Sequence, residues 1–114
     1  MSTIHGDMLR GHLETMVLSV LEQEPAHGLE ILRRLEESGA GLLRMKEGSL
    51  YPALYRLENA GKIKAAQEAE PHGRRGAPRR IYRITSRGRR QLAQGRAEWT
   101  RFVQVMGNII GAIA

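Results

Sequence analysis

Apolar residues recur every three or four positions through the first half of the chain, which is the spacing of helices with one buried face. This pattern predicts a first helix from about Asp7 to Gln23, capped by Asp7 and ended by Pro25. A second, shorter helix is predicted in HGLEILRRLEESG, and glycines break the chain after it. The residues expected to face the core from this second helix are Leu29, Leu32 and Leu35.

The stretch GSLYPALYRLENAGKI, residues 48–63, predicts a third helix with two different faces. Ser49 is expected to cap its start, Pro52 to lie in its first turn, and Gly61 to end it in a left-handed conformation. One face is apolar, with Leu50, Ala53, Leu54 and Leu57. The other carries groups that stack, pair with phosphate or bond base edges, namely Tyr51, Tyr55, Arg56 and Asn59. An ordinary surface helix with two tyrosines would show the same pattern.

Beyond Gly61 the pattern changes from helical to alternating, which is typical of strands. Residues 62–68 and 79–85 predict two strands, joined by the Gly- and Pro-rich stretch AEPHGRRGAP. Three helices followed by a basic hairpin predict a winged helix-turn-helix in residues 1–84. The expected fold is mainly α with a small β-hairpin, and residues 85–114 form a long C-terminal helix for dimerisation.

The distribution of charge points to a polyanionic partner. The net charge is +6, and no acidic residue occurs from Arg74 to Arg90, a window that contains eight arginines. An anionic membrane would require these arginines opposite a strong apolar face, but glycines and a proline interrupt the segment. Double-stranded DNA is therefore favoured, with the reading helix in the major groove and Ser49 near the backbone. The arginines expected to hold phosphates are Arg74, Arg75, Arg79 and Arg80.

The last helix is expected to begin near Thr85, whose hydroxyl can cap it, although Gly88 and Gly95 weaken its helix propensity. Its apolar stripe is longer than a winged-helix core needs, which indicates a second subunit and hence a homodimer. The ending GNIIGAIA is rich in glycine and poor in charge for such a helix. The predicted dimer-interface residues are Leu92, Trp99, Phe102, Val103, Met106, Ile109 and Ile110.

The chain resembles the PadR family of bacterial transcriptional regulators over nearly its whole length. The resemblance rests on GHLETMVLSVL, HGLEILRRLE, EGSLYPALYRLENAGKI and GRRGAPRRIYRITSRGRRQL. The single helix after the wing is similar to that of the small-type members. The resemblance implies a dimeric repressor that reads an operator and releases it when a small molecule or other signal arrives.

The resemblance also implies a pocket around Trp99, the only tryptophan, where a small planar hydrophobic effector stacks between subunits. The alternative is that Trp99 only anchors the dimer, as large interface aromatics commonly do. The residues expected around the effector are Met8, Thr15, Ser19, Gly95, Trp99 and Val103.

Other classes of function find less support. The chain has no cysteine, one aspartate and four scattered histidines, so neither a disulfide framework nor a metal site is expected. No nucleophile and base are paired by spacing, so neither enzymatic activity nor a cofactor is expected. The absence of a long apolar run predicts no membrane partner and a cytoplasmic protein. A winged helix used only for protein contacts remains the rival interpretation.

Overall fold

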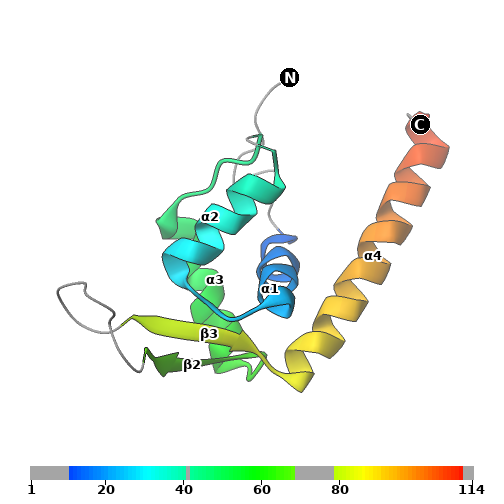
Figure 1. The fold of residues 1–114 in the computed structure, drawn as a ribbon. Helices are drawn as coiled ribbons and strands as arrows, with labels where there is room; N and C mark the ends of the chain where they lie inside the picture. The colour runs from blue at the N-terminus through cyan, green and yellow to red at the C-terminus, as the bar shows by residue number, and fades with distance from the viewer. Residues whose placement is uncertain (1–10, 41, 69–78, 112–114) are drawn as a thin grey trace.

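The computed structural model describes residues 11–40, 42–68 and 79–111. Within these ranges, four helices and three short strands follow one another. Figure 1 shows how they are arranged. In order they are α1 (Leu13–Gln23), β1 (Ala26–His27), α2 (Gly28–Ser38), α3 (Glu47–Asn59), β2 (Ile63–Gln67), β3 (Arg80–Ile84) and α4 (Ser86–Ile110). This architecture confirms the predicted fold class, a mainly α winged helix-turn-helix with a long last helix.

The first helix begins later than the sequence pattern predicts. Gly11 has a φ of 90° and turns the chain, so that α1 starts at Leu13 with His12 before it. The predicted cap, Asp7, lies outside the described residues. The buried side of α1 includes Val17, Leu18 and Leu21, which are the centre of the core.

The sheet has three strands, in the order β1-β3-β2, where the sequence predicts only a hairpin. The β2–β3 pair is antiparallel and runs from Ile63 opposite Ile84 to Gln67 opposite Arg80. The additional strand, β1, pairs Ala26 with Tyr82 and is only two residues long. Such a short strand has no alternating pattern, so no periodicity indicates it. Its last residue, His27, also caps α2, because its Nδ1 accepts a bond of 3.2 Å from the backbone N–H of Glu30.

The third helix has the predicted end but a different start. Its N-cap is Lys46, whose side chain makes no capping bond, and Ser49 lies inside the first turn. Pro52 consequently falls in the second turn, where it removes one helical N–H. Both expectations for this start, a Ser49 cap and a first-turn Pro52, are therefore wrong. At the other end Gly61 has a φ of 73°, and the N–H of Lys62 donates to the carbonyl of Leu57 at 2.9 Å, the bond that closes a Schellman motif.

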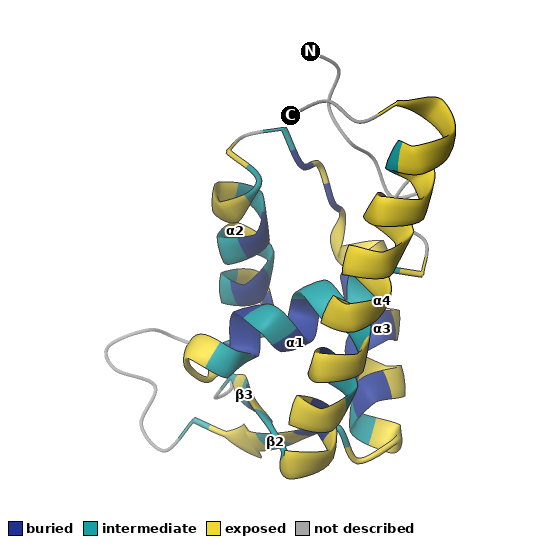
Figure 2. Cartoon of the chain, turned by 90° about the vertical axis from the view of Figure 1, so that its right-hand side faces the viewer, coloured by how far each residue is buried: buried dark blue, intermediate teal, exposed yellow. Residues whose placement is uncertain are grey.

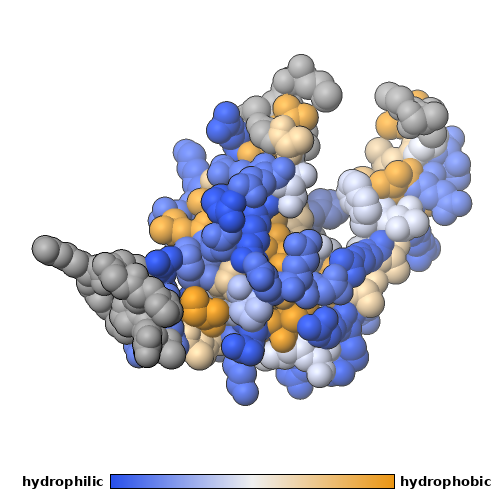
Figure 3. Space-filling view, viewed as in Figure 1, coloured by the Kyte–Doolittle hydropathy of each residue, from blue (hydrophilic) through white to orange (hydrophobic). Residues whose placement is uncertain are grey.

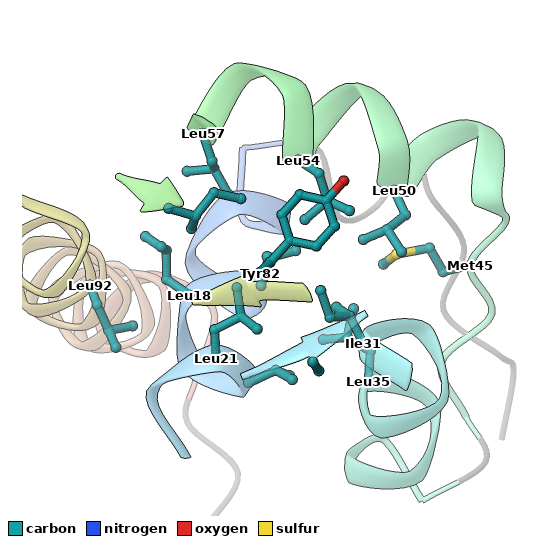
Figure 4. Close-up of a cluster of buried hydrophobic side chains, with 14 of the residues drawn as sticks. Leu18, Leu21, Ile31, Leu35, Met45, Leu50, Leu54, Leu57, Tyr82 and Leu92 are labelled. Atoms are coloured by element: carbon teal, nitrogen blue, oxygen red, sulfur yellow. The ribbon is translucent and has the colours of Figure 1, made fainter. Parts of the chain in front are cut away.

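The core lies between α1, α2, α3 and the sheet, and Figure 4 shows its side chains converging from these elements. The apolar face predicted for α3 is buried as expected, with Leu50, Ala53, Leu54 and Leu57. In α2, however, Leu29 is 53% exposed and Ile31 is fully buried. The inward face of α2 is therefore rotated from the predicted one and includes Leu35, with Leu32 partly buried.

The last helix leaves the core at an angle and is exposed along most of its length (Figures 1 and 2). Thr85 caps it as predicted, since its Oγ1 accepts a 3.1 Å bond from the N–H of Gly88. The first turns of α4 belong to the same core as the winged helix, because Leu92 is only 1% exposed. The division at residues 84 and 85 into two units therefore stays a prediction.

Candidate DNA-binding surface and interhelical pocket

The polar face of α3 borders a groove with strand β3. Four of its predicted DNA-contacting side chains are exposed together with Ser49: Tyr51, Tyr55, Arg56 and Asn59. Of the two tyrosines, Tyr55 is the more exposed, at 70% against 41% for Tyr51. The groove has a volume of about 630 Å³. Three of these residues line it together with two residues of β3, which we call the wing strand. The full lining is Tyr51, Tyr55, Glu58, Asn59, Arg80 and Tyr82.

Tyr51 is set in place by a glycine at the start of α2. A Cβ at Gly28 would lie 2.8 Å from Cε1 of Tyr51, so a larger residue at this position would displace the ring. Burial is the main cause that raises the pKa of Tyr51, followed by the charges of Glu47 and Tyr82. The phenol therefore remains protonated near neutral pH and can donate a hydrogen bond. The sequence offers no signal for this contact, since the two residues lie far apart in it.

Each described arginine of the predicted DNA surface has an acidic residue near its guanidinium. The Nη2 of Arg80 donates to Oε2 of Glu58 at 2.8 Å. The Nε of Arg56 lies 3.6 Å from Oε2 of Glu14. The window from residue 74 to 90 is free of acids in sequence, but the fold brings carboxylates to it from other elements.

Arg79 is held between two partners at the edge of the sheet. Its Nη1 lies 2.6 Å from Nε2 of His27, and its Nε lies 3.9 Å from a carboxylate oxygen of Glu68. The predicted phosphate contacts Arg74 and Arg75 lie outside the described residues. The described members of the predicted phosphate contacts are thus Arg79, in the first position before β3, and Arg80 within that strand.

A second hollow, of about 730 Å³, lies between α1 and α4. Figure 3 shows the molecule hollowed between the upper half of α4 and the rest of the chain. Four of the predicted effector-binding residues line this pocket: Thr15, Ser19, Gly95 and Trp99. Of the other two, Met8 lies outside the described residues, and Val103 is not part of the lining. Six lining residues were absent from the prediction: His12, Met16, Leu92, Arg96, Thr100 and Phe102.

The mouth of the pocket carries three aromatic rings. The rings of Trp99 and Phe102 are stacked, with centroids 6.0 Å apart and planes 22° apart. The imidazole of His12 meets the indole edge-on, at 5.4 Å and 81°. Phe102 and Val103 follow Trp99 by three and four residues, so both lie within about 60° of it around the helix axis. Helical spacing alone therefore does not distinguish Phe102, which lines the pocket, from Val103, which does not.

Close packing and an ion pair hold α4 against α1 at the base of the pocket. A Cβ at Gly95 would lie 2.8 Å from Cγ2 of Thr15, so this glycine lets the two helices approach. Nearby, Nη2 of Arg96 donates to Oε1 of Glu22 at 2.8 Å. The hydrogen bond from Arg96 is the main cause that lowers the pKa of the Glu22 carboxyl, and the same bond raises the pKa of Arg96.

The outer half of α4 displays the apolar stripe that was predicted to form a dimer interface. Its exposed members are Trp99, Phe102, Val103, Met106, Ile109 and Ile110, and Val105 is exposed as well. Leu92 differs, because it is buried in the core of its own chain. Its assignment to the dimer interface is therefore wrong, since a side chain with 1% exposure has almost no surface to offer a partner.

Two absences hold within the described ranges. No three His, Cys, Asp or Glu side chains of residues 11–40, 42–68 and 79–111 are grouped so as to hold a metal ion. In the same ranges, no helix is both long and apolar enough to cross a membrane.

A three-helix core whose last helix has an exposed polar face beside an antiparallel wing defines the winged helix-turn-helix class of DNA-binding proteins. Residues 17–94 match the model of the Transcriptional regulator PadR-like family. Since this match covers more than half of the chain, the protein belongs to that family of transcription regulators. Regulators of this family bind DNA as dimers and are generally not enzymes.

Individual relatives agree with this assignment. Transcriptional regulator Rv3488 of Mycobacterium tuberculosis is 31% identical over 87 residues, which are 76% of this chain and 75% of that protein. A transcriptional regulator from Clostridium thermocellum has a similar structure, with a TM-score of 0.84 and 31% identity over 95% of this chain and 99% of that one. The PadR-like transcriptional regulator BC4206 from Bacillus cereus has a TM-score of 0.76 and 29% identity, over 95% of this chain and 100% of that one.

Proposed function

We propose that this protein is a dimeric repressor that binds a two-fold operator and releases it when a small planar hydrophobic molecule occupies the interhelical pocket. The observation that carries the proposal is the groove between α3 and β3, where exposed tyrosines and Asn59 lie beside Arg80. Stacking, amide and cationic groups on one helix face are those that read base edges and phosphates. Membership of a family of transcriptional regulators supports a regulatory role for DNA binding at this surface.

Dimerisation is supported by the outer half of α4. Its apolar side chains have no partner within the described chain that covers them, and Ile109 is 73% exposed. A contiguous apolar surface of this kind marks an interaction site on soluble proteins. A second copy that packs its own α4 against this face would make a symmetric pair and set the distance between two α3 helices.

The effector is proposed to lie against Trp99 and Phe102. Both rings are about half-exposed in the single chain. The pocket they border is lined mainly by apolar atoms, and Thr15, Ser19 and Thr100 contribute hydroxyl groups to the lining. A flat apolar molecule would gain stacking contacts there. Because one wall of the pocket is α1, which also packs on α3, an effector that favours one α1–α4 arrangement would change DNA affinity.

DNA binding is tested by measuring affinity for duplexes at several salt concentrations. A random-sequence duplex library is first enriched on the purified full-length protein, and the enriched and random duplexes are then compared. Neutralising Arg75 is expected to weaken binding to both alike and to reduce the salt slope by about one. Arg56→Ala is expected to change preference among sequences, at a cost of about 1–3 kcal/mol for the enriched duplex if it contacts a base. Equal losses on both duplexes from both variants would contradict this division of roles.

The rival function, a winged helix used only for protein contacts, makes the opposite prediction. Such a protein would bind no duplex with an affinity that falls as salt rises. Salt-dependent enrichment of a duplex sequence by the wild-type protein therefore decides between the two.

Effector binding is tested through the fluorescence of Trp99, which is the only tryptophan and so reports on this pocket alone. The titrants are planar hydrophobic compounds, acridine-type cations among them, added without DNA and then in its presence. Quenching with linked weakening of DNA binding is the expected result. Phe102→Ala should reduce the affinity for the titrant, while Val105→Ala, a change at an exposed residue outside the lining, should not. If no compound alters the fluorescence, Trp99 is only a packing anchor.

A further inference from the structure

The DNA-facing groove contains one residue whose charge opposes DNA. Glu58 lies on α3 between the exposed Tyr55 and Asn59, and it is the only acid in the lining of the groove among the described residues. Its side chain is 35% exposed, so the carboxylate faces the same space as the tyrosines. A phosphate backbone close to this surface would meet a negative charge as well as the arginines.

Glu58 is bound to the cation of the wing strand. Its Oε2 accepts from Nη2 of Arg80 at 2.8 Å, and the Arg80 guanidinium also lies 5.9 Å from the centre of the Tyr82 ring. The carboxylate lies in the last turn of α3, next to the negative end of the helix dipole, where an acid is unfavourable and a neighbouring cation compensates. Arg80 is therefore engaged within the protein, and a phosphate must compete with Glu58 for it.

We infer that Glu58 is a specificity-determining residue, which holds Arg80 in the groove and so weakens non-specific DNA binding more than operator binding. The inference rests on the proposed DNA-binding function. On a duplex of arbitrary sequence, Glu58 keeps Arg80, and the wing makes one fewer phosphate contact. On the operator, α3 lies in the major groove and places the Glu58 carboxylate at the base edges, where it can accept a hydrogen bond from the amino group of a cytosine. Arg80 is then released from Glu58 and binds a phosphate. Repulsion of wrong partners is one of the two ways in which a binding surface gains specificity.

The test compares Glu58→Gln with a matched variant, Glu24→Gln. Glu24 also pairs with an arginine, since Nη2 of Arg34 donates to its Oε1 at 2.7 Å, but it lies outside the groove. Both substitutions raise the net charge by one and break one Glu–Arg pair. Affinities for the random-sequence and the enriched duplex are measured from low to high salt, and circular dichroism checks that each variant is folded.

Glu58→Gln is expected to tighten binding to the random-sequence duplex by about threefold at low salt, because an exposed pair of this kind has a modest strength. The salt slope should steepen by about one, as Arg80 gains a phosphate. Binding to the enriched duplex should tighten less, so that the ratio of the two affinities falls. Glu24→Gln should change neither the slope nor the ratio. In an Arg80→Gln background, Glu58→Gln should have no further effect on the random-sequence duplex.

Three results would overturn the inference. If Glu24→Gln acts like Glu58→Gln, the effect is one of total charge. If Glu58→Gln raises the affinity for both duplexes by the same factor, Glu58 does not determine specificity through Arg80. The same follows if Glu58→Gln still raises the affinity for the random-sequence duplex in the Arg80→Gln background. A wild-type protein without salt-dependent duplex binding would instead refute the proposed function itself, and the two failures are therefore distinguishable.

Discussion

Gly88 lies where α4 leaves the wing, and its replacement by alanine is the sharpest available test of how this junction is built. A Cβ at this position would overlap the carbonyl oxygen of Lys62 and would lie 2.8 Å from Cγ1 of Ile84. The surrounding backbone is tied down, because the same carbonyl of Lys62 accepts a 3.1 Å bond from the N–H of Thr85. The Thr85 hydroxyl in turn donates to the carbonyl of Gly61 at 2.7 Å. A backbone carbonyl in such a network cannot rotate away as a side chain can.

The expected destabilisation from Gly88→Ala follows from two opposing terms. Alanine in place of glycine favours a helix by about 1 kcal/mol. The overlap costs about 1–3 kcal/mol as overpacking, and a shift that breaks the Thr85 cap costs about 1 kcal/mol more. The net loss should therefore be about 2 kcal/mol, which corresponds to a fall in Tm of roughly 10 °C for a domain of this size.

The assay is thermal unfolding followed by circular dichroism, at one fixed protein concentration because dimerisation would make Tm depend on concentration. Gly48→Ala is the matched control, since Gly48 is an exposed residue of α3 whose added Cβ would meet no atom within 4 Å. That variant should gain about 0.5–1 kcal/mol. If Gly88→Ala unfolds at or above the wild-type temperature, the close approach of α4 to the Lys62 carbonyl is not a constraint, and the reasoning is refuted.

Three further predictions concern the dimer, the α1–α4 contact and the recognition helix. Ile109→Lys should leave the single chain folded, because the side chain is 73% exposed, but should convert the proposed dimer to a monomer in sedimentation equilibrium. An unchanged mass would place the interface elsewhere. Arg96 lowers the pKa of Glu22 in the folded chain, so this pair contributes stability above the ordinary value of 4.5 and loses it as pH falls through the lowered pKa. Wild-type protein should therefore lose more stability below pH 4.5 than Glu22→Gln does, and parallel acid-unfolding curves would contradict this. Glu14→Gln releases Arg56 and should tighten duplex binding by up to about threefold at low salt, while no change in a gel-shift titration would show that the pair does not compete with DNA.

Local signals along the chain were sufficient for most of the helices and their ends. The Thr85 cap and the Gly61 stop were predicted correctly, because each depends on residues within a few positions of itself. The buried face of α3 was predicted correctly as well, since helical spacing alone places its four apolar residues on one side. The start of α3 was wrong because the helix begins after Lys46, whose side chain makes no capping bond and so gives no signal in the sequence.

The arrangement of the candidate site depended on contacts between residues distant in sequence. The window from Arg74 to Arg90 contains no acidic residue, yet Glu58 from α3 and Glu68 after β2 reach Arg80 and Arg79 within it. The spacing within a single helix also does not say whether a leucine belongs to the protomer core or to a dimer face, and so Leu92 was misassigned. His12 had no local signal for its position beside Trp99.

By itself, therefore, the sequence determined the class of fold, the polar face of α3 and the apolar stripe of α4, because periodicity and capping act over a few residues and survive in any packing. Only the tertiary structure decided the two-residue strand β1, the pairing of Arg80 with Glu58 and the lining of the α1–α4 pocket. The physical reason is that such contacts depend on how far each helix is rotated and where the elements cross. Those quantities are fixed by the packing of the whole core, in which the members of each pair lie many residues apart.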